Sequence, residues 1–206
     1  MKTIFTTPVF RELLSLVARA FMRFKGYKIT GENPPYDKYV LVCAPHTSNW
    51  DFIYMLCVVL SRKMDVRWMG KRQLFRQPFK YIMIWLGGIP IERSTANNTV
   101  DTMVDAFNSN DRLTLLITPE GTRSKVRHWK TGFYHIAKAA NVPIVLGYLD
   151  ARYDSCGFGP VFERSDDIDQ DIAAIKHHYK DMVGLRPELG VTVDESHTGD
   201  NDTAGK

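Results

Sequence analysis

The first pattern along the chain is an amphipathic segment from Pro8 to Lys25. At about 100° per residue, its apolar side chains gather into one arc of a helical wheel, opposite a polar arc that carries several arginines. The pattern predicts a helix whose apolar face either packs on the core of the domain or lies in a membrane interface, which its basic polar face also suits. The apolar arc consists of Phe10, Leu13, Leu14, Leu16, Val17, Ala20, Phe21 and Phe24.

Short apolar runs and amphipathic runs alternate through the middle of the chain. The apolar runs predict strands, and the amphipathic runs predict helices between them. Alternation of this kind is typical of an α/β domain with a mainly parallel central sheet flanked by helices. The predicted strands cover residues 38–44, 66–70, 87–92, 113–117 and 142–149, and the predicted helices cover residues 49–62, 79–87, 95–110, 135–140 and 166–184.

The two ends of the chain differ from this middle part. Residues 1–30 hold the amphipathic helix, and a stretch rich in Gly, Asn and Pro separates it from the first predicted strand. Residues 190–206 lack apolar periodicity, so we expect a disordered tail there. Because 206 residues suffice for one domain with a full core, we predict a single α/β domain over residues 31–189.

The charge and cysteine content narrow the choice of partners and compartment. With 27 Lys and Arg against 23 Asp and Glu, the net charge of +4 does not predict a nucleic-acid partner. Its sign alone fits anionic lipid, a phosphorylated substrate or neither. Three scattered cysteines are too few for a disulfide framework, which favours a reducing, cytoplasmic compartment. No apolar run reaches the ~18 residues of a spanning helix, and charges interrupt the N-terminal segment, so we expect neither a spanning helix nor a cleaved signal peptide.

The candidate chemistry begins with His46, which follows the predicted strand at 38–44 in the stretch "PHTSNWDF". Ligands of open α/β sheets bind at the carboxyl ends of the strands, where this histidine falls. One interpretation of Asp51, five residues later, is structural, because Ser48 and Asp51 form the S-x-x-D pattern of a capping box. The other is that Asp51 orients the His46 imidazole as a general base, which a junction of loop and helix permits.

Two arginines follow other predicted strands. Arg93 ends "GGIPIER" and Arg123 ends "TPEGTR", so parallel strands would deliver both to the edge that carries His46. Guanidinium groups bind phosphate in a bidentate manner, and Gly121 permits a sharp turn that exposes backbone N–H groups. This edge is therefore a candidate anion site. Since no further His, Cys or paired carboxylate falls at ligand spacing near His46, we expect no metal and no cofactor.

Four segments, "PHTSNWD", "GGIPIER", "TPEGTRS" and "VPIVL", occur in this order along the chain. Together they resemble the four sequence blocks of the glycerolipid acyltransferase family, whose best-known members are the 1-acylglycerol-3-phosphate acyltransferases. The resemblance covers residues 46–146. The chain departs from the family pattern at Pro45, where many members have asparagine, and at Leu146, where a proline often closes the fourth block.

The resemblance implies an enzyme that moves a fatty acyl group from acyl-CoA or acyl carrier protein to a hydroxyl of a lysolipid such as 1-acylglycerol-3-phosphate. His46 is then the general base and Asp51 its partner. Such an enzyme is expected to act as a peripheral protein on the inner, cytoplasmic face of a membrane. The implied phosphate ligands of the acceptor are Lys71, Arg93 and Arg123, and the implied substrate-binding or site-shaping residues are Glu120, Gly121 and Thr122.

Several alternatives use the same residues. The acceptor can instead be another lysophospholipid or an amino-acid-derived lipid precursor, and water as acceptor would make the protein a thioesterase. A non-catalytic lipid-binding scaffold would not need His46 and Asp51. The aromatic and aliphatic stretch at residues 75–88 either lines an acyl tunnel, faces lipid or packs in the core.

Overall fold

The computed structural model describes residues 3–91, 96–165 and 167–191 of the chain. Within these ranges, seven strands form one sheet in the order β1-β7-β6-β2-β5-β3-β4. Neighbouring strands are parallel except β6 and β7, which are antiparallel. The prediction of an α/β domain with a mainly parallel sheet is therefore confirmed. The strands are β1 (Lys28–Thr30), β2 (Lys38–Ala44), β3 (Val66–Lys71), β4 (Gly88–Ile91), β5 (Leu113–Ile117), β6 (Ile144–Asp150) and β7 (Ser155–Phe162).

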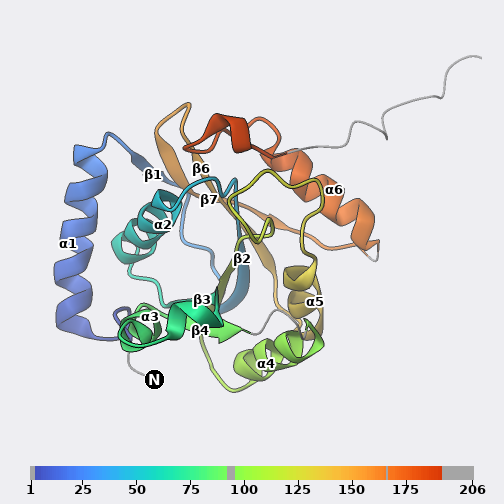
Figure 1. Ribbon diagram of the computed structural model, residues 1–206, viewed down its shortest axis with the longest axis horizontal. Coiled ribbons are helices and arrows are strands. Elements are labelled where there is room, and N and C mark those ends of the chain that lie inside the picture. Colours follow the sequence, from blue (N-terminus) through green and yellow to red (C-terminus); the bar gives the residue numbers. More distant parts are fainter. Residues whose placement is uncertain (1–2, 92–95, 166, 192–206) are drawn as a thin grey trace, which may run out of the picture.

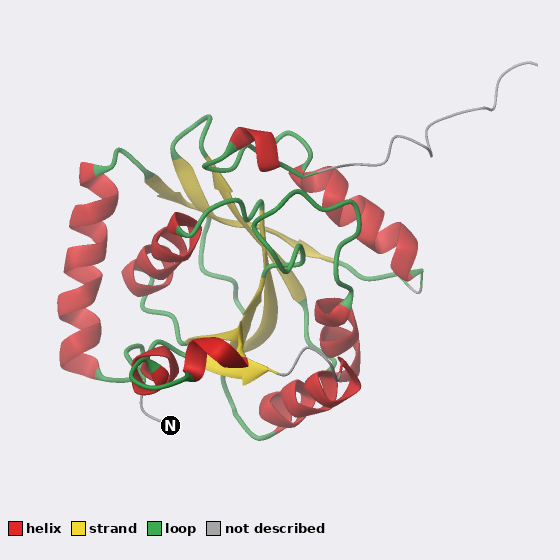
Figure 2. Cartoon of the chain, in the orientation of Figure 1, coloured by secondary structure: helices red, strands yellow, loops and turns green. Residues whose placement is uncertain are grey.

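Helices cover both faces of the sheet (Figure 1), which runs between them as a twisted central layer (Figure 2). Helices α2 and α3 lie on one face, with α1 outside α2, and helices α4, α5 and α6 lie on the other. Two short 3-10 turns, η1 (Arg72–Phe75) and η2 (Pro187–Leu189), complete the described elements. The helices are α1 (Pro8–Phe24), α2 (Trp50–Ser61), α3 (Lys80–Trp85), α4 (Ala96–Asn108), α5 (Gly132–Ala139) and α6 (Ile168–Tyr179).

Strand β2 shows why the sequence folds into three layers. Its side chains alternate between the two faces of the sheet, as strand geometry requires. Tyr39 and Leu41 pack in the core beneath α1 and α2, whereas Val40 and Val42 pack in the core beneath α4, α5 and α6. A parallel strand covered on both faces needs an unbroken apolar run, and "YVLVCA" supplies one.

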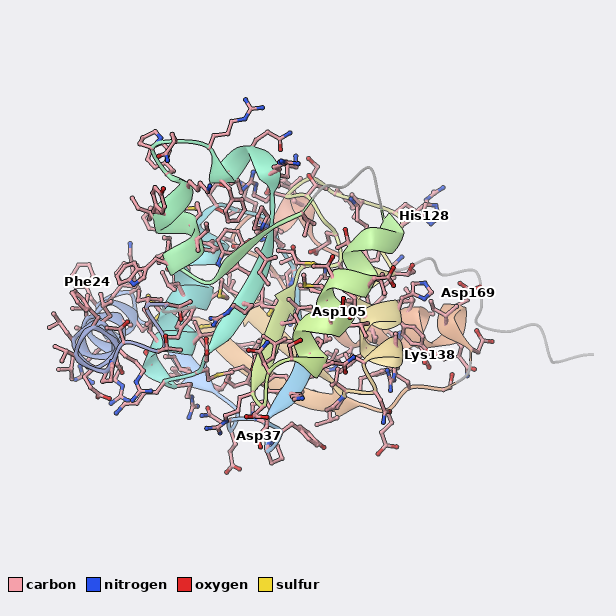
Figure 3. All side chains as sticks on the ribbon, turned by 90° about the horizontal axis from the view of Figure 1, so that it is seen from below. Phe24, Asp37, Asp105, His128, Lys138 and Asp169 are labelled. Atoms are coloured by element: carbon pink, nitrogen blue, oxygen red, sulfur yellow. The ribbon has the colours of Figure 1, made fainter. Side chains whose placement is uncertain are left out.

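Helix α1 turns most of its apolar arc away from the domain. The face that packs on α2 carries Ser15, Ala18 and Met22, which are only 2–3% exposed. Most of the predicted arc is exposed, and Phe24, at the end of the molecule that α1 forms (Figure 3), is 85% exposed. Packing on the core therefore accounts only for the edge of the arc. Among the described helices, none combines the length and the apolar character needed to cross a bilayer.

Strands β1 and β7 are absent from the sequence-based prediction. The segment that forms β7 contains Gly157, Gly159 and Pro160, and these residue types are signals for turns. The structure explains one of them: Gly157 has φ +155°, and a Cβ atom there would lie 2.0 Å from the carbonyl oxygen of Thr30 in β1. The close pairing of β1 with β7 thus requires a glycine at this position, and glycine is a residue type that predicts a turn from sequence alone. The predicted disordered tail falls almost wholly at residues 192–206, outside the described ranges.

Candidate active site

His46 lies in the connection between β2 and α2, at residues 45–49. Strand β2 sits in the middle of the sheet between β5 and β6, and β5 runs parallel to it. The carboxyl ends of β2 and β5 therefore meet at the same edge of the sheet. As a result, the loop that carries His46 lies against the loop at residues 118–131, which follows β5 and carries the sequence "PEGTRS".

The His46 and Asp51 side chains are in direct contact. Nδ1 of His46 lies 3.1 Å from Oδ2 of Asp51. The same oxygen accepts the backbone N–H groups of Thr47, at 2.6 Å, and Ser48, at 2.7 Å. The Asp51 side chain is 9% exposed and the His46 side chain is 20% exposed, so the carboxylate is the more buried of the two groups. The loop-to-helix junction brings the two groups together as the spacing predicts.

The structural role predicted for this sequence is also present. Asp51 reaches back to the N–H of Ser48, and Oγ of Ser48 accepts the N–H of Trp50 at 3.2 Å. These bonds satisfy backbone donors at the start of α2 that have no partner within the helix. The two interpretations of Asp51 are therefore compatible, because one carboxylate oxygen serves both the helix start and the imidazole.

Glu120 holds the main chain of His46. Its Oε1 atom accepts the His46 N–H at 3.1 Å, and the residue is buried. Burial raises the pKa of the Glu120 carboxyl to about 7, against the lowering effect of the hydrogen bond from the His46 backbone and of the His46 charge. Glu120 does not line the cavity described below, so its place in the described structure is that of a support beneath the loop.

The turn after Glu120 behaves only partly as the sequence suggests. Gly121 has φ +64°, a left-handed conformation that favours glycine. Its N–H, however, already donates to the carbonyl oxygen of Thr118 at 3.1 Å. This one N–H is therefore engaged within the turn, and the use of other backbone N–H groups near Gly121 for binding an anion stays a prediction. Thr122 lines the cavity beside it and is exposed.

Two of the three predicted phosphate ligands lie at the site. Lys71 is the last residue of β3, and both Lys71 and Arg123 are exposed and line the same cavity as His46. Arg123 donates from Nη1 to the side-chain oxygen of Asn49, which ties the two loops together. Arg93 lies outside the described residues.

A cavity of about 540 Å³ extends between α2 and the sheet, with His46 and Asp51 in its wall. Its remaining lining is mostly apolar, while Lys71, Thr122 and Arg123 form a polar, exposed end. Of the stretch at residues 75–88, only Met83 lines this cavity; Phe79, Tyr81 and Ile82 are exposed instead. The apolar lining comes chiefly from Phe52, Met55, Val58 and Val59 of α2 and from Leu41, Trp68, Leu116, Leu149 and Phe158 of the sheet.

Sequence reasoning missed the residues that support this site from a distance. Asn49 lies within the "PHTSNWD" segment, but only the fold reveals its bond to Arg123. Thr47, buried beside His46, accepts the N–H of Arg186 from the far end of the chain. No sequence spacing signals such a contact. In the described part of the chain, no three His, Cys, Asp or Glu side chains gather in a way that could hold a metal ion.

A histidine and carboxylate pair at the edge of an α/β sheet, beside a large apolar cavity, defines a site suited to chemistry on a lipid-like substrate. Comparison with known proteins gives the class. The chain belongs to the acyltransferase family, since the model of the family described as Acyltransferase matches residues 26–146.

Particular relatives narrow the likeness further. The chain is 32% identical over 145 residues to a 1-acyl-sn-glycerol-3-phosphate acyltransferase of Haemophilus influenzae, a match that covers 64% of this chain and 59% of that protein. It is 35% identical over 109 residues to the enzyme of the same name from Salmonella typhimurium, covering 50% of this chain and 43% of that protein. The chain thus spans about half the length of the curated relatives it matches.

A solved structure supports the fold independently. The crystal structure of the 1-acyl-sn-glycerophosphate acyltransferase from Thermotoga maritima aligns with a TM-score of 0.58 and 14% sequence identity. The alignment covers 82% of this chain and 78% of that one. At this level of identity the likeness shows a shared fold.

Proposed function

We propose that this protein transfers a fatty acyl group from a thioester donor, acyl-CoA or acyl carrier protein, to a hydroxyl of a lysolipid such as 1-acylglycerol-3-phosphate. One observation carries the proposal: the contacting pair of His46 and Asp51 stands in the wall of a cavity that is apolar at one end and cationic at the other. The family and the curated relatives support acyl transfer as the reaction.

In the proposed mechanism, His46 acts as the general base. With its ring proton on Nδ1, held by Asp51, the Nε2 atom is left to take the proton of the acceptor hydroxyl as the hydroxyl oxygen attacks the thioester carbonyl. The carbon–sulfur bond then breaks, and the imidazolium gives its proton to the leaving thiolate. Asp51 stabilises the imidazolium between these two steps, so no covalent acyl-enzyme is needed.

The apolar part of the cavity suits an acyl chain. Burial of methylene groups against side chains such as Phe52, Met55 and Phe158 stabilises a fatty chain by ~0.8 kcal/mol per CH₂. The acyl chain would enter between α2 and the sheet, which would leave its carbonyl carbon near His46. Residues 75–88 contribute little to this pocket, so the proposal places the acyl chain mainly against α2.

The cationic end of the cavity suits an anionic head group. Lys71 ends β3 and Arg123 lies in the loop after β5, the strand beside β3. Both line the same space as His46, where they would contact the phosphate of a lysophosphatidate. Arg93 is part of the proposal through its family position alone. The hydrogen bond from Arg123 to the side-chain oxygen of Asn49 keeps the guanidinium near the loop that carries His46.

The exposed apolar arc of α1 supports a peripheral attachment to a membrane. Leu13, Leu16 and Phe24 are exposed, and the exposed cations Arg23 and Lys25 lie at the C-terminal end of the same helix. Arg19 instead donates to the carbonyl oxygen of Ser61 in α2 at 2.9 Å. An interfacial helix combines these features, because apolar side chains enter the acyl boundary while cations meet anionic head groups. The three free cysteines fit the reducing, cytoplasmic side of such a membrane.

The product formed by the purified chain tests the proposed function. Palmitoyl-CoA or palmitoyl carrier protein is offered with lysophosphatidate, another lysophospholipid, an uncharged monoacylglycerol or an amino-acid-derived lysolipid, and the products are identified by mass spectrometry. The proposal expects diacylated phosphatidate, and it expects Lys71→Ala to raise KM for lysophosphatidate more than KM for the uncharged acceptor. Release of free palmitate that no acceptor suppresses would contradict the proposal and indicate a thioesterase. No product with either donor would contradict it and indicate a non-catalytic scaffold.

A further inference from the structure

Thr47 connects the candidate catalytic pair to the far end of the chain. Its backbone N–H donates to Oδ2 of Asp51 at 2.6 Å, and it follows His46 directly. The residue is 1% exposed, and its Oγ1 atom accepts the backbone N–H of Arg186 at 3.1 Å. The main chain of Thr47 therefore belongs to the site, while its side chain belongs to the segment at residues 183–186 that follows α6.

Gly184 in this segment packs closely against the side chain of Thr47. A Cβ atom at Gly184 would lie 2.5 Å from Oγ1 and 2.6 Å from Cγ2 of Thr47, closer than real Cβ contacts. The β-branched side chain of Thr47 has few rotamers, and its burial leaves it little room to turn away. Any side chain at Gly184 would therefore displace Thr47, and with it the N–H that holds Asp51.

The segment itself is fixed to the sheet. The N–H of Val183 donates to Oδ1 of Asp150 at 3.3 Å, and the carbonyl of Val183 accepts the N–H of Ala151 at 2.7 Å. Asp150 ends β6, which pairs directly with β2, the strand that leads to His46. Leu185 packs against the core beneath α2. Residues 183–186 thus run as a strap from the end of β6 to Thr47.

We propose that Thr47 is a positioning residue, which the strap at residues 183–186 seats so that its N–H holds the Asp51 carboxylate against the His46 imidazole. The strap lies beyond residues 26–146, the part of the chain that matches the family model. The inference rests on the proposed function, because it concerns the rate of the same acyl transfer. It assigns a catalytic consequence to a glycine that does not line the cavity of the site.

Substitutions at Gly184 test the contact. Gly184→Ala is expected to lower kcat about tenfold or more, since small displacements of a catalytic group cost large factors in rate, while KM for the acyl donor stays within about twofold. Gly190→Ala is the matched control, because a Cβ atom there would lie 3.4 Å from its nearest neighbour, an ordinary contact. The double variant Thr47→Ala with Gly184→Ala lacks the two closest atoms and keeps only the Thr47 Cβ atom, at 3.2 Å, so it is expected to be faster than Gly184→Ala alone.

A second pair of variants keeps the test independent of folding defects. Thr47→Ser retains the acceptor for the Arg186 N–H and is expected to keep kcat within about twofold, whereas the isosteric Thr47→Val loses the acceptor and is expected to slow the reaction severalfold. Wild-type kcat in Gly184→Ala, or equal rates in the serine and valine variants, would overturn the inference.

The ring ¹⁵N chemical shifts of His46, identified by their loss in His46→Ala, separate this inference from the proposed function. The inference expects them to change in Gly184→Ala and to match the wild type in Gly190→Ala, whether or not the protein transfers acyl groups. If the wild type transfers nothing and the shifts still change, the proposed function fails and the positioning contact stands. Unchanged shifts in Gly184→Ala would remove the positioning contact itself.

Discussion

Oδ2 of Asp51 lies 3.1 Å from Nδ1 of His46 while accepting two backbone N–H groups from the loop between them. The carboxylate is thereby fixed before any substrate arrives. Asp51→Asn removes the charge that stabilises an imidazolium and adds an amide that can donate, so we expect kcat to fall by roughly 10²–10⁴-fold. Steady-state kinetics with a fixed acyl donor provide the measurement.

Asp37→Asn is the control for this substitution, because Asp37, labelled in Figure 3, is exposed and precedes β2, whereas His46 follows that strand. Its kcat should equal that of the wild type. Should Asp51→Asn also keep kcat within about threefold, the role of Asp51 would reduce to the start of α2.

The buried Glu120 predicts a dependence of stability on pH. Burial raises the pKa of its carboxyl from 4.5 to about 7 in the folded protein, whereas the unfolded chain keeps the ordinary value. A raised pKa means that the folded state favours the protonated form, so its contribution to stability is complete below about pH 4.5 and is lost as the pH rises through 7. The side chain of Glu120→Gln does not titrate, so this variant should not lose stability in the same way as the pH rises.

Urea unfolding at pH 5 and pH 8 measures the effect. Between these pH values, the free energy of unfolding of the wild type should fall relative to that of Glu120→Gln by up to about 3 kcal/mol. Glu188→Gln, at an exposed position, should follow the wild type at both pH values. Parallel behaviour of wild type and Glu120→Gln would contradict the raised pKa.

The cavity predicts a selectivity for acyl chain length that depends on α2. Met55 lines the cavity, and Met55→Trp would fill part of it. We expect the ratio of kcat/KM for a sixteen-carbon donor to that for a ten-carbon donor to fall roughly tenfold, because each methylene excluded forfeits ~0.8 kcal/mol. Met55→Leu, which nearly conserves volume, should keep the wild-type ratio. An unchanged ratio in Met55→Trp would place the acyl chain elsewhere.

Polar substitutions on the two faces of α1 are expected to change two different properties, membrane binding and thermal stability. Leu13→Asn combined with Leu16→Asn alters exposed positions, so it should weaken binding to anionic lipid vesicles roughly tenfold or more and leave Tm unchanged. Ala18→Asn alters the buried face against α2 and should lower Tm. Vesicle sedimentation and thermal unfolding provide the two readouts. If the leucine variant lowered Tm instead, the arc would pack within the protein.

The elements predicted correctly are those whose signal is local. Strand β2 and helix α2 carry an unbroken apolar run and a charged first turn, and their junction fixes how His46 and Asp51 meet. The loop after β5 could be assigned to the same edge because parallel strands end together. Strand β7 escaped prediction because its glycine, which the pairing with β1 requires, is locally a turn signal.

The remaining features depend on contacts between distant segments. A helical wheel locates the apolar arc of α1, but which face meets α2 is decided by the close packing of Ser15, Ala18 and Met22. Gly184 approaches Thr47, although the two residues lie near opposite ends of the α/β domain in the sequence. Neither periodicity nor motif spacing encodes such a pair, so only the folded chain reveals the support beneath the site.

Thiol release from palmitoyl-CoA in the presence of lysophosphatidate, compared between the wild type and His46→Ala, tests whether His46 is the general base. We expect the wild type to release thiol in step with formation of phosphatidate, and the variant, folded to the same Tm, to lose at least about 10²-fold in rate. Transfer by His46→Ala at the wild-type rate would contradict the assignment of His46 as the general base.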